Sequence, residues 1–275
     1  MAKKNSPKGG NRNASLAADL PPSLHAERRG EIAILRLARP EKRNALDDVL
    51  ILGMERFFTA LPDDIKAVVL HGEGEHFSAG LDLSSLAEAS VAEGVQHSRM
   101  WHQAFNTIEF GKVPVVAVLH GAVVGGGLEL AAAAHIRVAE TSTYYALPEG
   151  TRGIFLGGGG TVRLPRLIGT SRVTDMMLTG RTMSAEEGQA IGLSQYLVKP
   201  KTGLAKAIEL AKQIATNAPM TNFAIMHVLP RIAESDPASG YMAEALMAAV
   251  AQGSDEAKSR LKDFLEKRGK KVLHK

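Results

Sequence analysis

The order of strand and helix patterns along this 275-residue chain constrains its fold more than any other feature. Up to Val198, short apolar strand patterns alternate with helical ones. Residues Glu31 to Leu37 alternate as a half-buried strand does, and Val115 to Leu119 form a continuous apolar run typical of a buried strand. From Leu204 to the end, only helical periodicity occurs. Strands mixed with helices, followed by helices alone, predict an α/β core that carries a helical C-terminal part.

Composition divides the chain into three parts. Residues 1–28 are polar and rich in Gly, Pro, Asn and Lys, which predicts a disordered basic leader. Residues 29–200 carry the mixed pattern and form the predicted catalytic core, and residues 201–275 carry the predicted helices. With 45% hydrophobic residues, the chain has enough apolar content for a sizeable core.

The positive net charge of +4 is concentrated at the two ends of the chain. Residues 1–30 carry a net charge of +4 and residues 256–275 one of +5, which leaves −5 for the rest. Nucleic-acid binding requires clustered cations on the protein surface. We therefore expect no nucleic-acid partner, although a binding protein that touches RNA through its basic ends is one alternative.

The absence of cysteine excludes disulfides, thiolate metal sites and cysteine nucleophiles. A reducing cytoplasm is the natural setting for such a chain. The first 20 residues lack the apolar segment of a secretory signal, and no apolar run reaches the roughly 18 residues of a membrane span. The histidines show no ligand spacing, so we predict no metal site.

Two glycine clusters suggest nucleotide binding, but neither fits a known phosphate-binding motif. Residues 153–160 supply glycines without the lysine that a P-loop requires. In the dinucleotide pattern that would start at Gly125, Leu130 occupies the position of the last glycine. Ser78 likewise lacks the preceding glycine of a nucleophile elbow.

A different use of glycine remains. Gly126 lies where a predicted strand gives way to a helix, so its amide belongs to the unpaired first turn. The turn from Ser78 to Leu81 could supply a second exposed amide. Two converging amides make an oxyanion hole, whereas glycines that only permit tight turns are the alternative, and spacing alone does not decide between them.

Glu129 favours the oxyanion hole because it stands between Leu128 and Leu130 in an otherwise apolar segment. A carboxylate there is costly to bury unless it is paired or used in chemistry. The alternatives are a salt bridge to Arg137 or an exposed helix edge. Glu149 follows Pro148 in a loop, where a glutamate is usually solvated.

Four ordered landmarks resemble the crotonase (enoyl-CoA hydratase/isomerase) superfamily over roughly residues 25–270. They are Arg39-Pro40-x-x-x-Asn44-Ala45-Leu46, Phe77-Ser78-Ala79-Gly80-Leu81-Asp82-Leu83, His120-Gly121-x-x-x-Gly125-Gly126-Gly127-Leu128-Glu129-Leu130, and Pro148-Glu149 followed by Gly153, Gly157 and Gly159-Gly160-Thr161. A closing Phe264-x-Glu266-Lys267-Arg268 also fits the family. The sequence departs from the family's usual pattern at Gly150, Arg152 and Leu156.

The resemblance implies a crotonase-like ββα spiral core with a helical C-terminal region that builds homotrimers, often paired into hexamers. It implies an acyl-CoA thioester substrate and no separate cofactor, because coenzyme A is part of the substrate. By the family's motifs, the amides of Leu81 and Gly126 hold the thioester oxygen. The other implied substrate-binding positions are Lys42, Ala45, Ala79, Gly80, Asp82, Leu83, Gly125, Pro148 and Gly157.

The resemblance also implies a reaction, the syn addition of water across the C2–C3 double bond of a 2-enoyl-CoA. In it, Glu129 holds and deprotonates the water, and Glu149 exchanges the proton at C2. Another crotonase-type reaction, double-bond isomerisation or hydratase-lyase cleavage, is the main alternative. An isomerase could use Glu149 alone.

Overall fold

The computed structural model describes residue 16 and residues 20–85 and 90–266. Its centre is a six-stranded sheet, in which β1 is antiparallel to β2 and every later neighbour is parallel. In spatial order the strands are β1 (Leu24–Arg29), β2 (Ile32–Leu37), β3 (Ala67–Gly72), β4 (Val115–Leu119), β6 (Ile136–Glu140) and β9 (Tyr196–Val198). The parallel order explains the continuous apolar runs of the sequence, because parallel sheets are covered on both faces.

A smaller sheet lies beside the main one and carries the loops of the candidate site. It consists of β5 (Ala122–Val124), β7 (Tyr144–Ala146) and β8 (Thr182–Ser184), with β5 parallel to β7 and β8 antiparallel to it. The strand β5 leads directly into Gly125 and the next helix, while β7 leads into Pro148 and Glu149. The parallel pairing of β5 and β7 therefore brings the Gly125 loop and the Glu149 loop to the same edge of the smaller sheet.

Alternate residues along the central strands face two different cores. On β2, Leu35 and Leu37 pack into the larger core, whereas Ile32 and Ile34 pack into a second, smaller one. Helix α7 (Gly203–Ala215) covers the second core and buries Ala207, Leu210 and Ala211 in it.

The larger core is covered by helices that connect the strands. They are α1 (Asp48–Thr59), α2 (Val91–Glu109), α3 (Gly126–Ala133), α4 (Gly160–Ile168), α5 (Thr170–Thr179) and α6 (Ala185–Ala190), with short 3-10 turns η1 (Pro40–Lys42), η2 (Leu83–Ser85) and η3 (Gly150–Arg152). Helix α1 begins after Asp47, whose side chain accepts a hydrogen bond from the Leu50 amide as an N-cap. Every residue of α3 is buried, as expected for a short helix that is apolar except for Glu129.

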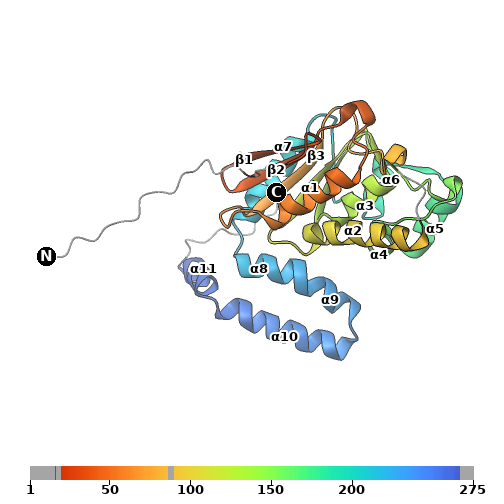
Figure 1. Ribbon diagram of the computed structural model, residues 1–275. Helices are drawn as coiled ribbons and strands as arrows, with labels where there is room; N and C mark the ends of the chain where they lie inside the picture. Colours follow the sequence, from red (N-terminus) through yellow and green to blue (C-terminus); the bar gives the residue numbers. More distant parts are fainter. Residues whose placement is uncertain (1–15, 17–19, 86–89, 267–275) are drawn as a thin grey trace.

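The C-terminal helices form a separate layer outside the sheet-containing body (Figure 1). They are α8 (Pro219–Phe223), the π-helical turn η4 (Ala224–Val228), α9 (Leu229–Glu234), α10 (Pro237–Gly253) and α11 (Asp255–Leu265). In Figure 1, α8 and α9 lie between α10 and the body. The only buried residue of α10 is Gly240, and α11 has none.

Two predicted boundaries are corrected by these elements. The leader was predicted to extend to residue 28, yet β1 already begins at Leu24. The polar composition of this segment does not indicate a strand, but its backbone pairs with β2. Residues 1–15 and 17–19 of that leader lie outside the described part of the chain. The predicted C-terminal helical region, 201–275, includes α7, but α7 packs against the sheet as part of the core.

None of the helices among the described residues is long and apolar enough to span a membrane.

Candidate active site

A cavity of about 200 Å³ brings together five of the residues singled out from the sequence. These are Leu81, Gly126, Glu129, Glu149 and Gly157. The remaining lining residues are His97, Ser98 and Trp101 from α2, and Ile154, Phe155, Leu156 and Gly158 from the loop after Glu149. The cavity thus joins the N-terminus of α3, one side of α2 and the glycine loop that precedes α4.

Two backbone amides converge on this cavity. A Cβ built on Gly126 would lie 3.3 Å from the Leu81 nitrogen, and one built on Gly80 would lie 3.1 Å from the Gly126 nitrogen. Within the described part of the chain, neither amide of Leu81 and Gly126 donates a hydrogen bond. Two unpaired donors that line the same cavity, one of them at a helix N-terminus, form a candidate oxyanion hole.

Glycine is required beside these amides for steric reasons. Gly80 has a φ of +92° and Gly125 a φ of +51°, both in the left-handed region. A Cβ on Gly80 would also approach the Val124 carbonyl oxygen to 2.6 Å. The glycines therefore do permit tight turns, and those turns are what expose the two amides.

Glu129 is held inside the cavity by the glycine loop that precedes α4. Its carboxylate is 3% exposed and accepts hydrogen bonds at Oε1 from the Gly158 amide at 2.9 Å and the Gly160 amide at 2.7 Å. The alternatives of a salt bridge to Arg137 and of an exposed helix edge are both wrong. Arg137 instead donates to the carbonyl oxygens of Leu193 and Ala134.

Glu149 is buried as well, although loop glutamates are usually solvated. It is 7% exposed, and its Oε2 has no hydrogen-bond partner among the described residues. A Cβ on Gly125 would lie 2.5 Å from its Oε1, so the absence of a side chain at Gly125 makes room for this carboxyl. A buried carboxyl oxygen without a partner, facing a cavity, is available to a ligand.

The two carboxyls share an environment that favours protonation. The pKa of Glu129 is raised to about 7. Burial is the main cause and the neighbouring Glu149 adds to it, while the Gly160 and Gly158 amides and Arg163 act in the opposite direction. Burial also raises the pKa of Glu149. Near neutral pH the pair can therefore hold one proton and one negative charge, as acid and base catalysis in a single site requires.

Most of the other predicted substrate-binding residues lie outside the cavity lining, on loops and short 3-10 turns. They are Lys42, Ala45, Ala79, Gly80, Asp82, Leu83, Gly125 and Pro148. Asp82 is tied down by Arg39 at 2.9 Å and Lys42 at 3.1 Å, and hydrogen bonds from Ser84 and Lys42 hold its pKa well below the usual range. Gly80 and Asp82 directly flank Leu81, and Pro148 precedes Glu149.

Sequence reasoning missed the contribution of α2. Trp101 lies beside the Gly126 amide of the candidate oxyanion hole, since a Cβ on Gly126 would lie 3.2 Å from its ring. Its indole nitrogen and His97 both bond to Asp48 Oδ1, at 3.2 Å and 2.8 Å. His97 and Trp101 are four residues apart and therefore lie on one face of α2. Only the tertiary structure shows which residues that face contacts.

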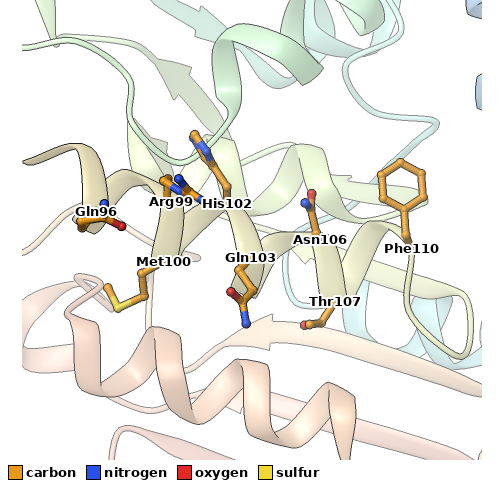
Figure 2. Close-up of a pocket in the computed structure, with 8 residues that line it drawn as sticks. All are labelled: Gln96, Arg99, Met100, His102, Gln103, Asn106, Thr107 and Phe110. Atoms are coloured by element: carbon orange, nitrogen blue, oxygen red, sulfur yellow. The ribbon is translucent and has the colours of Figure 1, made fainter.

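A wider hollow of about 850 Å³ lies elsewhere on α2 and contains none of the predicted site residues (Figure 2). Its lining comes from α2 and the residue after it: Gln96, Arg99, Met100, His102, Gln103, Asn106, Thr107 and Phe110. The smaller cavity is the better candidate site because it combines unpaired amides with two buried carboxyls. No group of three or more metal-ligating side chains occurs in the described part of the chain.

Comparisons with known proteins agree with this geometry. The sequence model of the enoyl-CoA hydratase/isomerase family matches residues 27–272. A short-chain-enoyl-CoA hydratase from Clostridium acetobutylicum is 30% identical over 245 residues, which cover 88% of this chain and 94% of that protein. A carnitinyl-CoA dehydratase from Salmonella enteritidis is 35% identical over 222 residues, covering 80% and 84%.

A solved structure is more similar still. The crystal structure of a protein proposed to be an enoyl-CoA hydratase, from Rhodopseudomonas palustris, has a TM-score of 0.89 and 55% sequence identity. The match covers 92% of this chain and 98% of that one, so the two share the whole architecture.

Proposed function

The chain belongs to the enoyl-CoA hydratase/isomerase family, with the crotonase fold, and we propose that it is an enoyl-CoA hydratase that adds water across the C2–C3 double bond of a 2-enoyl-CoA. One observation carries this proposal. Two buried carboxyls and two unpaired amides line the same cavity of about 200 Å³. An isomerase that uses one glutamate would have no need of the second.

The amides of Leu81 and Gly126 bind the thioester oxygen. When water attacks C3, negative charge moves through the conjugated system onto that oxygen, which gives an enolate-like thioester. Hydrogen bonds that are already oriented toward the developing charge stabilise it without reorganisation, and one such donor is typically worth about 3 kcal/mol.

Glu129 and Glu149 divide the proton transfers. Glu129 acts as the base, because its Oε1 accepts two amide hydrogen bonds that favour the ionised form, while Oε2 is not held by these amides. It takes a proton from the water as the oxygen bonds to C3. Glu149 acts as the acid, because its Oε2 has no hydrogen-bond partner among the described residues and can deliver a proton to C2. Proton exchange between the glutamates and solvent then restores the starting state.

The size and shape of the cavity favour a short acyl chain. Its volume of about 200 Å³ is below the range of about 300–1,000 Å³ common for small-molecule sites. Leu156, at a position where the family more often has proline, is buried and forms part of the wall. The CoA part of the substrate would extend over the loops that carry Lys42, Ala45, Ala79, Asp82 and Leu83. The chemistry needs no separate cofactor.

We further propose that the protein forms homotrimers, alone or paired into hexamers. Met242, Leu246 and Val250 follow one another at four-residue spacing on α10, and each is more than half exposed. Such an apolar stripe on a helix with a single buried residue is typical of an interface.

A screen of acyl-CoA thioesters with product identification tests the proposed reaction. We expect purified protein to convert crotonyl-CoA into 3-hydroxybutyryl-CoA, identified by mass spectrometry and NMR, and to act more slowly on long-chain enoyl-CoAs. A product with a shifted double bond, or cleavage of a carbon–carbon bond, would instead identify a different reaction of the family.

A further inference from the structure

Arg163 is a buried cation on α4 that does not contact the candidate active-site cavity. It is 6% exposed, and its guanidinium donates three hydrogen bonds. Its Nε donates to Glu109 Oε2 at 2.6 Å and its Nη2 to Asn106 Oδ1 at 2.7 Å, both on α2. A buried arginine is costly unless it is paired in this way, so the arrangement calls for an explanation.

The third hydrogen bond of Arg163 connects it to the catalytic site. Its Nη1 donates to the Gly158 carbonyl oxygen at 3.1 Å, while the Gly158 amide donates to Glu129. Gly158 is thus held on one side by the guanidinium and on the other by the carboxylate. Gly159 has a φ of +93°, and any Cβ there would collide with Arg163 Nη1, so this loop closely surrounds the cation.

Helix α2 fixes the orientation of the guanidinium. Figure 2 shows His102 and Asn106 leaving α2 on one side, opposite Gln103 and Thr107. Glu109 belongs to the same side, since it lines a second cavity with His102, Asn106 and Arg163. The guanidinium therefore bridges α2 and the glycine loop through planar, directional contacts that a lysine cannot reproduce.

We propose that Arg163 is a positioning residue for Glu129, which fixes the Gly158–Gly160 loop so that its two amides hold the carboxylate in the geometry for accepting a proton. Asn106 and Glu109 are the supports that keep Arg163 in place. The inference rests on the proposed function, in which Glu129 is the base. An arginine that only tied α2 to α4 would affect folding stability and leave the chemistry of Glu129 unchanged.

The charges around the two groups set the direction of the expected effect. Glu149 faces Glu129 across the cavity and favours its protonated form, whereas Arg163 favours the ionised form. Glu109 and His102 face Arg163 from α2, and Arg166, Arg231 and Glu234 line the second cavity from α4 and α9. Loss of Arg163 removes a cation and loosens two amide donors, and both changes raise the pKa of Glu129.

The test compares Arg163→Met and Arg163→Lys with Arg166→Met. Arg166 is a matched control on the same helix, because its side chain is 52% exposed and pairs with Glu234. We expect Arg163→Met to lower kcat for crotonyl-CoA hydration about 100-fold with little change in KM. The acidic limb of its pH–rate profile should move to higher pH, because this limb reports ionisation of the base. Arg163→Lys should recover part of the shift but not full kcat, and the control should match wild type.

A measurement without substrate separates this inference from the proposed function. The carboxyl titration of Glu129 is followed by carbon-13 NMR and assigned by its loss in Glu129→Gln. An upward shift of the Glu129 pKa in Arg163→Met supports the inference even if wild-type protein hydrates no enoyl-CoA, a result that would refute the function alone. Unchanged kcat and an unchanged titration in folded Arg163→Met would overturn the inference. If that variant does not fold, Asn106→Ala removes one support only, and an unshifted titration there overturns the inference equally.

Discussion

Glu129 and Glu149 are two carboxyls of the same type that differ in how the protein holds them. Two amides fix one oxygen of Glu129, while Oε2 of Glu149 has no partner among the described residues. An amide-bound carboxylate is suited to accept a proton, and an unpartnered buried carboxyl is suited to carry one. This difference at the scale of single atoms is the structural basis for assigning them as base and acid.

Replacing either glutamate by glutamine should abolish most of the activity. Glutamine keeps the size of the side chain but can neither take up nor release the proton, and general acid or base catalysis contributes about 10²–10⁴-fold. We expect both Glu129→Gln and Glu149→Gln to lower kcat on crotonyl-CoA by this range, measured in steady-state assays. Full activity of Glu129→Gln would contradict the two-glutamate mechanism.

Glu129→Gln should also change the dependence of stability on pH. The folded pKa of Glu129, about 7, lies above its ordinary value of 4.5. The stabilisation linked to the protonated form is therefore fully present below pH 4.5 and is lost as the pH rises through 7. Glutamine stays neutral at every pH. The free energy of unfolding of the variant minus that of wild type should therefore be larger above pH 7 than at acidic pH, by up to about 3 kcal/mol. Urea denaturation at several pH values measures this gain, and a difference that is constant with pH would contradict it.

Single residues could be predicted from the sequence to different degrees. Glu129 was identifiable because a charge inside an apolar segment is unusual, whereas Glu149 follows a proline in a loop and only the family's motif singled it out. Gly158 and Gly160, whose amides hold Glu129, stood out only as part of the glycine cluster at residues 153–160. No sequence pattern singled out Arg163. Its role depends on contacts with α2, about fifty residues earlier, which no local pattern encodes.

At the scale of elements, the N-terminus of α3 and the turn before η2 together form the candidate oxyanion hole. The bridge between Ser78 and Val123 holds the turn against β5, so that Leu81 faces the first amide of α3. The space between these amides is narrow, and glycine at position 126 keeps it open. Adding a single methyl group at position 126 therefore tests the oxyanion hole directly.

Gly126→Ala should block the oxyanion hole without unfolding the protein. Gly126 does not have a positive φ, so alanine is compatible with its backbone, but the new Cβ would lie 3.3 Å from the Leu81 nitrogen. We expect kcat to fall about 10²–10³-fold. Gly94→Ala on α2 is the control, because a Cβ there meets no atom within 4 Å. Wild-type kcat in Gly126→Ala would show that the thioester oxygen binds elsewhere.

Element prediction succeeded where a segment's own sequence determines its burial. The strand patterns at β2 and β4 and the helical periodicity after Leu204 were identified from the sequence. The strands β1, β5 and β8 were missed, because β1 is polar and half exposed and the other two have three residues each. The helical periodicity also gave no sign of the π-helical turn between α8 and α9, where His227 bonds to the Gly111 carbonyl oxygen.

At the scale of the whole molecule, the C-terminal layer carries the proposed interface between copies of the chain. The helices α10 and α11 expose apolar side chains and bury almost nothing within the chain. We expect light scattering to show trimers or hexamers in solution. Leu246→Glu, which places a charge in the middle of the α10 stripe, should shift the population toward monomers, whereas Leu178→Glu on α5, another strongly exposed position, should not. A monomeric wild-type protein would contradict the proposed assembly.

The most direct test of the central claim is to run the reaction in D₂O and locate the label by NMR. If the two glutamates and the amide pair carry out hydration, crotonyl-CoA gives 3-hydroxybutyryl-CoA with one deuterium at C2, on the same face as the new hydroxyl. Both Glu129→Gln and Glu149→Gln should fail to form this product at a comparable rate. A 3-enoyl product with deuterium at C2 and no hydroxyl at C3 would contradict the account. It would show that C4 loses a proton while C2 gains one, so that the site moves a double bond rather than adding water.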